Sequence, residues 1–151
     1  MKPIRLLVDS FADEDALNAQ AGNAREIMSR LDPARIEVST FVAGKPDPRL
    51  VQRSATRLVQ LGPRGQTIKI LIEFIWGRHD ILFYIKPSPA ARLYLQVRPR
   101  WLDKRIVVGM VESQSDLRNE PTVKPEQVGI WERTVLRSDF LFSNSRSEER
   151  R

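Results

Sequence analysis

Runs of apolar residues separated by polar segments divide the chain at regular intervals. The first run, residues 4–8, contains one basic residue and ends before Asp9 and Ser10, which is typical of a buried strand. Residues 105–111 form the most strongly apolar run. The pattern predicts six strands, at residues 4–8, 36–42, 56–61, 81–85, 105–111 and 140–142.

The segments between these runs have helical features. Asn23 is suited to cap a helix that ends near Leu31, because its side chain can accept a hydrogen bond from a first-turn amide. Ser88 followed by Pro89 is likewise a favourable helix start. The pattern predicts helices at residues 23–31, 67–77, 89–97 and 125–137, and a helical turn at residues 50–54.

Alternating strands and helices indicate an α/β fold, with a Rossmann-like, mostly parallel sheet of about six strands and helices on both faces. Ligands of such sheets bind outside the carboxyl ends of the strands, where the strand order reverses. The loops after residues 8, 85, 111 and 142 are therefore the candidate binding loops. Beyond the first loop, the substrate-binding candidates are Lys86, Ser88, Ser113, Asn144 and Ser145.

The first loop offers Asn18, Gln20, Gly22 and Asn23. A dinucleotide or ATP site needs several glycines there, because the backbone must approach the phosphates closely. The loop has neither the GxGxxG spacing nor a Walker lysine, so a nicotinamide or ATP site of the usual kind is disfavoured and no cofactor is expected. Its amides can instead hydrogen-bond a polar ligand such as a sugar; the alternative is a solvated turn with a helix cap.

The candidate loops contain carboxylates suited to catalysis or to metal binding. Glu112 directly follows the strongest strand and is the candidate catalytic residue, as a base or a hydroxyl ligand. Asp13 and Asp15 form an Asp-x-Asp pattern that can chelate a divalent cation. Acids here can also simply favour a helix N-terminus, and we prefer that interpretation, so no metal site is expected. Glu120 is interpreted as a solvated loop acid.

Composition excludes several classes of site. Cysteine is absent, which excludes disulfides, thiolate metal sites and a cysteine nucleophile. The single histidine, His79, excludes a site with two histidine ligands and is predicted to lie on the surface at the amino edge of the sheet. No apolar run is long enough to span a bilayer, and the N-terminus lacks the features of a signal peptide. We expect a cytoplasmic protein, soluble or loosely attached to the inner face of a membrane.

Lys and Arg number 25 against 19 acids, and the excess is concentrated in residues 86–105. The cations of this basic segment are Lys86, Arg92, Arg98, Arg100, Lys104 and Arg105. Such a patch could hold anionic lipid head groups, aided by Phe74 and Trp76, although a solvated basic face is the simplest interpretation. No nucleic-acid motif accompanies it, so a nucleic-acid partner is not expected. The alternative hypothesis is a stand-alone Rossmann-like module that docks on an anionic membrane or partner through this face.

Four segments carry a family resemblance that covers essentially the whole chain. They are Leu-Val-Asp-Ser-Phe at 7–11, Asn-Ala-Gln-Ala-Gly-Asn-Ala-Arg-Glu at 18–26, Asp-Ile-Leu-Phe-Tyr at 80–84 and Asp-Phe-Leu-Phe-Ser-Asn-Ser-Arg-Ser at 139–147. Through them the chain resembles the N-terminal half of a group 1, family-four-like retaining glycosyltransferase, whose GT-B fold has two Rossmann domains.

The resemblance implies that residues 1–145 form the acceptor-binding domain and that the charged tail, 146–151, begins a missing continuation. A nucleotide-sugar donor would be held mainly by the missing domain, and the sugar would pass to a hydroxyl acceptor with retention and without a required metal. This half alone is expected to be inactive. Ser145 matches the family's serine-rich turn. Glu112 stands roughly where many members have a histidine, and the first loop has fewer glycines than usual.

Overall fold

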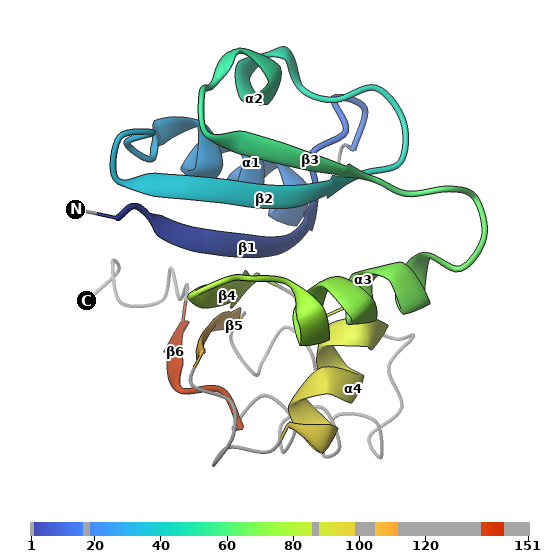
Figure 1. Ribbon diagram of the computed structural model, residues 1–151. Helices are drawn as coiled ribbons and strands as arrows, with labels where there is room; N and C mark the ends of the chain where they lie inside the picture. Colours follow the sequence, from blue (N-terminus) through green and yellow to red (C-terminus); the bar gives the residue numbers. More distant parts are fainter. Residues whose placement is uncertain (1, 17–18, 86–87, 99–104, 112–136, 144–151) are drawn as a thin grey trace, which may run out of the picture.

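The computed structural model describes residues 2–16, 19–85, 88–98, 105–111 and 137–143. Six strands form one sheet in which every neighbouring pair is parallel (Figure 1). Their spatial order is β3-β2-β1-β4-β5-β6, which is the doubly wound Rossmann order. The strands are β1 (Ile4–Phe11), β2 (Ile36–Val42), β3 (Thr56–Gln60), β4 (Ile81–Tyr84), β5 (Ile106–Val111) and β6 (Phe140–Ser143).

Helices cover both faces of the sheet, as expected. One buried cluster joins Leu7 and Leu82 of the sheet to α3 (Gln66–Trp76) and α4 (Pro89–Val97). A second cluster joins Val8 and Phe83 to α1 (Ala19–Arg30) and α2 (Pro48–Gln52). Adjacent strand residues such as Leu7 and Val8 therefore point to opposite cores, which explains why the strands are continuously apolar. In Figure 1, α3 and α4 lie in front of the sheet and α1 behind it.

Two helix starts differ from the expectation. Helix α1 begins at Ala19, so Asn23 lies within it and does not cap it. The segment Ala19–Ala21 consists of good helix formers, and their intrinsic preference extends the helix before the apolar periodicity becomes visible. Helix α2 begins at Pro48, with Asp47 as its cap, earlier than the predicted turn. The predicted helix at residues 125–137 lies almost entirely outside the described residues.

His79 lies at the amino edge of the sheet, as predicted, but the prediction of a surface position was wrong. Only 7% of it is exposed, and its Nε2 lies 3.0 Å from Glu73 Oε1 in the last turn of α3. Glu73 also pairs with Arg57 of β3, so two basic side chains share one carboxylate. Burial lowers the pKa of His79, although Glu73 opposes that shift. Through Glu73, the histidine therefore links the end of α3 to the amino edge of the sheet.

Candidate functional site

The strand order reverses between β1 and β4. From β1 the chain passes through α1 on one face to β2, and from β4 it passes through α4 on the other face to β5. The carboxyl ends of β1 and β4 are thus the place where a doubly wound sheet binds its ligands. In register, Asp9 of β1 lies beside Tyr84, the last residue of β4. We define the switch-point site by Asp9, Tyr84, Ser88 and Ser138.

Asp9 is a buried carboxyl group at this edge. It is 7% exposed, and its Oδ2 accepts a hydrogen bond of 2.9 Å from the backbone N–H of Ser88. Ser88 caps α4, because its Oγ accepts a hydrogen bond from the N–H of Ala91. Burial raises the pKa of Asp9 to about 6, although hydrogen bonds from Ser88 oppose the shift. A carboxyl with such a pKa can hold or exchange a proton near neutral pH.

An irregularity in β1 accompanies Asp9. The pairing of β1 with β2 shifts register between Leu7 and Phe11, so that the strand is irregular over the segment that contains Asp9. The buried hydroxyl of Thr40 in β2 donates to Ser10 O at 2.9 Å and supports the irregular backbone. Bulges are common next to functional sites, because they redirect a side chain out of the regular alternation.

Tyr84 extends the site toward β5 and β6. Its hydroxyl lies 2.7 Å from Ser138 Oγ, and the ring passes over Gly109 of β5. A methyl group at Gly109 would collide with the ring, so the glycine is required for this placement. Burial raises the pKa of Tyr84, and the nearby Asp9 acts in the same direction. The tyrosine therefore remains a neutral hydrogen-bonding group at neutral pH.

The loop between β1 and α1 is fixed by Asp13 and Arg25. The Asp13 carboxylate, 6% exposed as a residue, accepts hydrogen bonds from the backbone N–H groups of Ala43 and Gly44. Arg25 of α1 donates to the carbonyl oxygens of Asp13 and Ala16, at 2.6 and 2.9 Å. Asp13 therefore ties two loops together rather than stabilising a helix N-terminus, which corrects our preferred interpretation. Within the described ranges, no group of three or more acidic or histidine side chains is placed to hold a metal.

Replacement of Asp13 by alanine should lower the free energy of unfolding by about 2 kcal/mol, because the backbone N–H groups of Ala43 and Gly44 lose a charged acceptor. Urea unfolding followed by circular dichroism measures this. The matched control is Asp15→Ala at the exposed neighbouring acid, which should change stability by less than about 0.5 kcal/mol. A rise in melting temperature of the unmodified protein on addition of Mn²⁺, lost in Asp13→Ala, would instead support the metal interpretation.

The structure places the site residues predicted from the sequence in different parts of the fold. Ser88 lies at the switch point. Gly22 lies within α1, and a Cβ added there would meet nothing within 4 Å, so no close backbone approach requires a glycine. Asn23 is an exposed residue of the same helix, and Gln20 lies in its first turn. The remaining candidates lie outside the described residues; they are Asn18, Lys86, Glu112, Ser113, Asn144 and Ser145.

Asp9 was missed as a site residue. In the sequence it marked the end of the first strand, whereas the strand continues to Phe11. An acid beside the last apolar residues of the first strand of a parallel sheet was the available signal, because that position faces the switch point.

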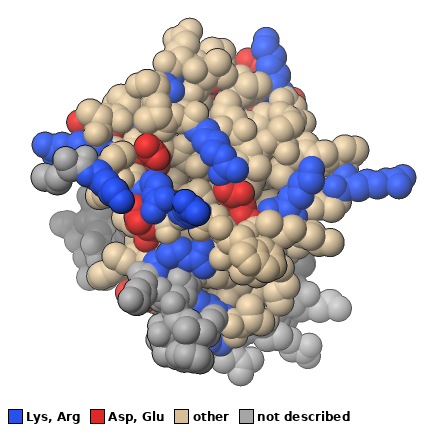
Figure 2. Space-filling view, viewed as in Figure 1, with Lys and Arg blue, Asp and Glu red and all other residues tan. Residues whose placement is uncertain are grey.

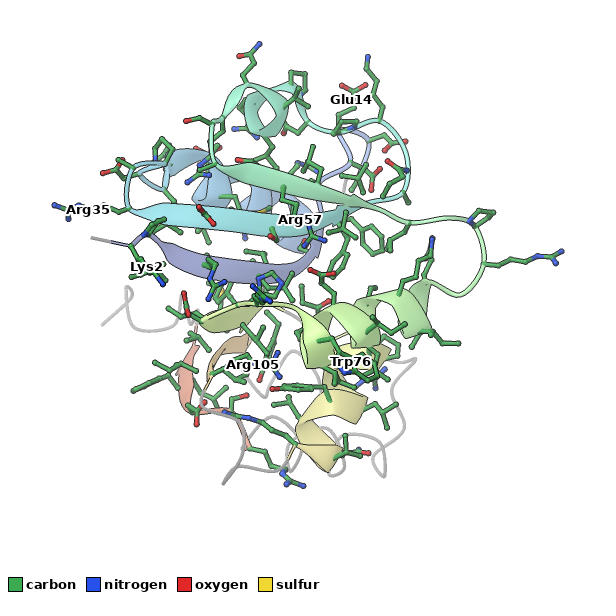
Figure 3. The ribbon with its side chains drawn as sticks, viewed as in Figure 1. Lys2, Glu14, Arg35, Arg57, Trp76 and Arg105 are labelled. Carbon is green, nitrogen blue, oxygen red and sulfur yellow. The ribbon has the colours of Figure 1, made fainter. Side chains whose placement is uncertain are left out.

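The basic segment is not a continuous solvated face. Arg98 is buried and donates to Arg105 O and to Asp139 Oδ2, at 2.6 and 3.0 Å. Arg105 points inward to Tyr94 Oη at 3.0 Å and to the carbonyl of Phe74 (Figure 3). Both arginines therefore hold α4 and β5 together. Phe74 is also buried and cannot contribute to a membrane contact. Lys86, Arg100 and Lys104 lie outside the described residues.

No family model matches the chain, and comparisons with curated proteins and with solved structures found no match. Among the described helices, none has the length and apolar character needed to cross a membrane.

Proposed function

We propose that this chain is the acceptor-binding half of a retaining glycosyltransferase that moves a sugar from a nucleotide-sugar donor to a hydroxyl acceptor. The observation that carries the proposal is the buried Asp9 carboxyl at the switch point between β1 and β4. The Rossmann strand order supports a ligand at that edge, and the resemblance of the four segments described above supplies the class of reaction.

In this proposal Asp9 receives a hydroxyl group of the acceptor. An ionised carboxylate accepts hydrogen bonds from hydroxyl groups, and such charge-assisted bonds are stronger than neutral ones. Ser88 holds the carboxylate in place through its backbone N–H. The donor phosphates belong to the second domain of the complete enzyme, so the isolated chain binds acceptor weakly and does not transfer sugar. Glu112 is the proposed base, because it directly follows β5 in the sequence.

Titration of the 151-residue chain with a panel of monosaccharides, followed by two-dimensional NMR, tests the proposal. The panel contains glucose, galactose, mannose and N-acetylglucosamine. At least one is expected to bind with a millimolar dissociation constant and to shift the amide signals of Asp9 and Ser88. Asp9→Asn should weaken that binding about tenfold, which corresponds to loss of one charge-assisted hydrogen bond.

The control is Asp32→Asn, which removes an exposed acid outside the switch-point site and should leave binding unchanged. UDP alone should bind this chain no more tightly than it binds an unrelated protein. Absence of monosaccharide binding, or binding that is equal in the wild type and Asp9→Asn, would contradict the proposed acceptor site. Sugar transfer from UDP-glucose by the isolated chain would contradict the proposed division between two domains.

A further inference from the structure

Helix α3 is apolar on both of its sides. Ile70 and Phe74 point into the core, as expected for a helix packed on a sheet. The outward side nevertheless carries Ile68, Ile72 and Trp76, at the i, i+4, i+8 spacing of one helical face. Ile68 is 63% exposed and Trp76 is 73% exposed. Figure 3 shows Trp76 at the end of α3, on the side of the helix that faces the viewer.

The neighbouring helix α4 packs on α3 and also exposes apolar residues. Leu93 and Val97 of α4 are exposed and are also four residues apart. The two helices are held together beneath the surface, where the rings of Phe74 and Tyr94 stack with centroids 5.5 Å apart. We call the exposed side of these two helices the α3–α4 face. Its apolar members are Ile68, Ile72, Ile75, Trp76, Leu93 and Val97.

The charged side chains of the α3–α4 face are all basic. Exposed cations flank the apolar residues in α3, in α4 and in the segments next to α3; they are Arg64, Lys69, Arg78 and Arg92. Within residues 61–79 and 88–98 the one acid is Glu73, and its carboxylate is mostly covered by pairing with Arg57 and His79. Figure 2 shows blue side chains projecting from a tan surface over α3, on the right of the molecule.

These four cations differ from most other surface cations in that they have no acidic partner among the described residues. Arg5, Arg30, Arg35, Lys45 and Arg49 all have acidic partners within 4 Å. Arg64, Lys69, Arg78 and Arg92 form no ion pair in the part of the chain that the structure describes. A surface that combines exposed isoleucine and tryptophan with cations that lack acidic partners among the described residues fits a partner that is both apolar and anionic.

We propose that the α3–α4 face docks on an anionic lipid surface. The cations would meet lipid head groups, and the apolar side chains would enter the boundary between head groups and acyl chains, where tryptophan is favoured. A second copy of the chain is a poorer occupant, because two such faces would oppose like charges. Among the cations of the basic segment at residues 86–105 that the structure describes, only Arg92 belongs to this face, since Arg98 and Arg105 point inward. The inference does not depend on the proposed sugar chemistry.

Co-sedimentation of the 151-residue chain with sucrose-loaded vesicles tests the proposal. One vesicle contains phosphatidylcholine with one third phosphatidylglycerol, and the other contains phosphatidylcholine alone. Binding is expected to the anionic vesicle only and should fall steeply as NaCl rises from 0.05 to 0.5 M. The double variant Arg64→Gln/Lys69→Gln should lower the partition coefficient about 25-fold, from about fivefold for each cation near the surface. Ile72→Ser/Trp76→Ser should lower it at least tenfold.

The matched controls remove similar side chains elsewhere. Val51→Ser replaces an exposed apolar residue of α2, and Arg35→Gln replaces an exposed cation that has an acidic partner. Both should retain wild-type binding, and circular dichroism confirms that every variant is folded. No binding to anionic vesicles, equal binding to both vesicles, or equal losses in the control variants would overturn the proposal. Concentration-dependent self-association without vesicle binding, abolished by Ile72→Ser/Trp76→Ser, would also overturn it, in favour of a second copy.

Discussion

Replacement of Asp9 by asparagine should stabilise the protein at pH 7 by about 3 kcal/mol and leave its stability nearly unchanged at pH 4. Burial raises the pKa of Asp9 to about 6 from 3.8. The folded state therefore binds a proton more tightly than the unfolded chain does, and stability falls as pH rises from about 4 to about 6. Asparagine resembles the protonated carboxyl, can still accept the hydrogen bond from Ser88 and has no charge to bury. Urea unfolding across this pH range measures the difference.

An acid with the opposite shift provides the control. The pKa of Asp80 is lowered, chiefly by a hydrogen bond from the backbone N–H of Arg5. Its contribution to stability is present above pH 4 and is lost as pH falls further, so Asp80→Asn should destabilise the protein at pH 7 and have less effect at low pH. If Asp9→Asn were destabilising at pH 7, the carboxylate would be a net stabilising group and its burial would not control its pKa. A residue that costs stability at neutral pH is typical of a functional site.

Replacement of Gly109 by alanine should destabilise the protein by about 3 kcal/mol, because the added methyl group would overlap the ring of Tyr84. Tyr84 is 2% exposed and has no space in which to move without disturbing the core. A displaced ring would also lose the hydrogen bond to Ser138. Urea unfolding at pH 7 should show a lower midpoint with an unchanged slope.

The same substitution at Gly22 has the opposite sign. Gly22 lies within α1 with open space around it, so alanine should stabilise the helix by about 1 kcal/mol. Tyr84→Phe should reduce the cost of Gly109→Ala, since the phenol oxygen is one of the atoms that the methyl group meets. Wild-type stability of Gly109→Ala would show that the tyrosine ring does not lie over β5.

The central strands β1, β4 and β5 could be predicted from the sequence because they are packed between helices on both faces and are therefore largely apolar. The edge strands β3 and β6 are more exposed, and β3 has a shorter apolar run. The end of β1 was the exception, since Asp9 and Ser10 interrupt the apolar run while the backbone continues to Phe11. The start of α1 was missed because Ala19 and Gln20 carry no apolar periodicity, although both favour a helix. Burial in the core produces a periodic pattern of apolar residues that can be recognised in the sequence. Intrinsic helix preference produces no such pattern, so the first residues of α1 were not recognised.

Buried charged and polar side chains could not be located in the same way. Arg98 and Asp9 are buried beside partners that lie far from them in the sequence. Arg98 meets Asp139, 41 residues away, and Asp9 meets Ser88, 79 residues away. A charged residue in a polar sequence context resembles a solvated one until its partner is known.

The order of the strands also determines when the switch-point site can form during folding. Strands β1, β2 and β3 come from one continuous stretch of chain, and β4, β5 and β6 come from another. The two sets are joined in the sheet by the pairing of Leu6 with Ile81 and of their neighbours. This contact closes the longest loop between paired strands, at the largest cost in chain entropy. Asp9 lies in the first stretch and Ser88 in the second, so their hydrogen bond exists only in chains in which β1 and β4 have paired.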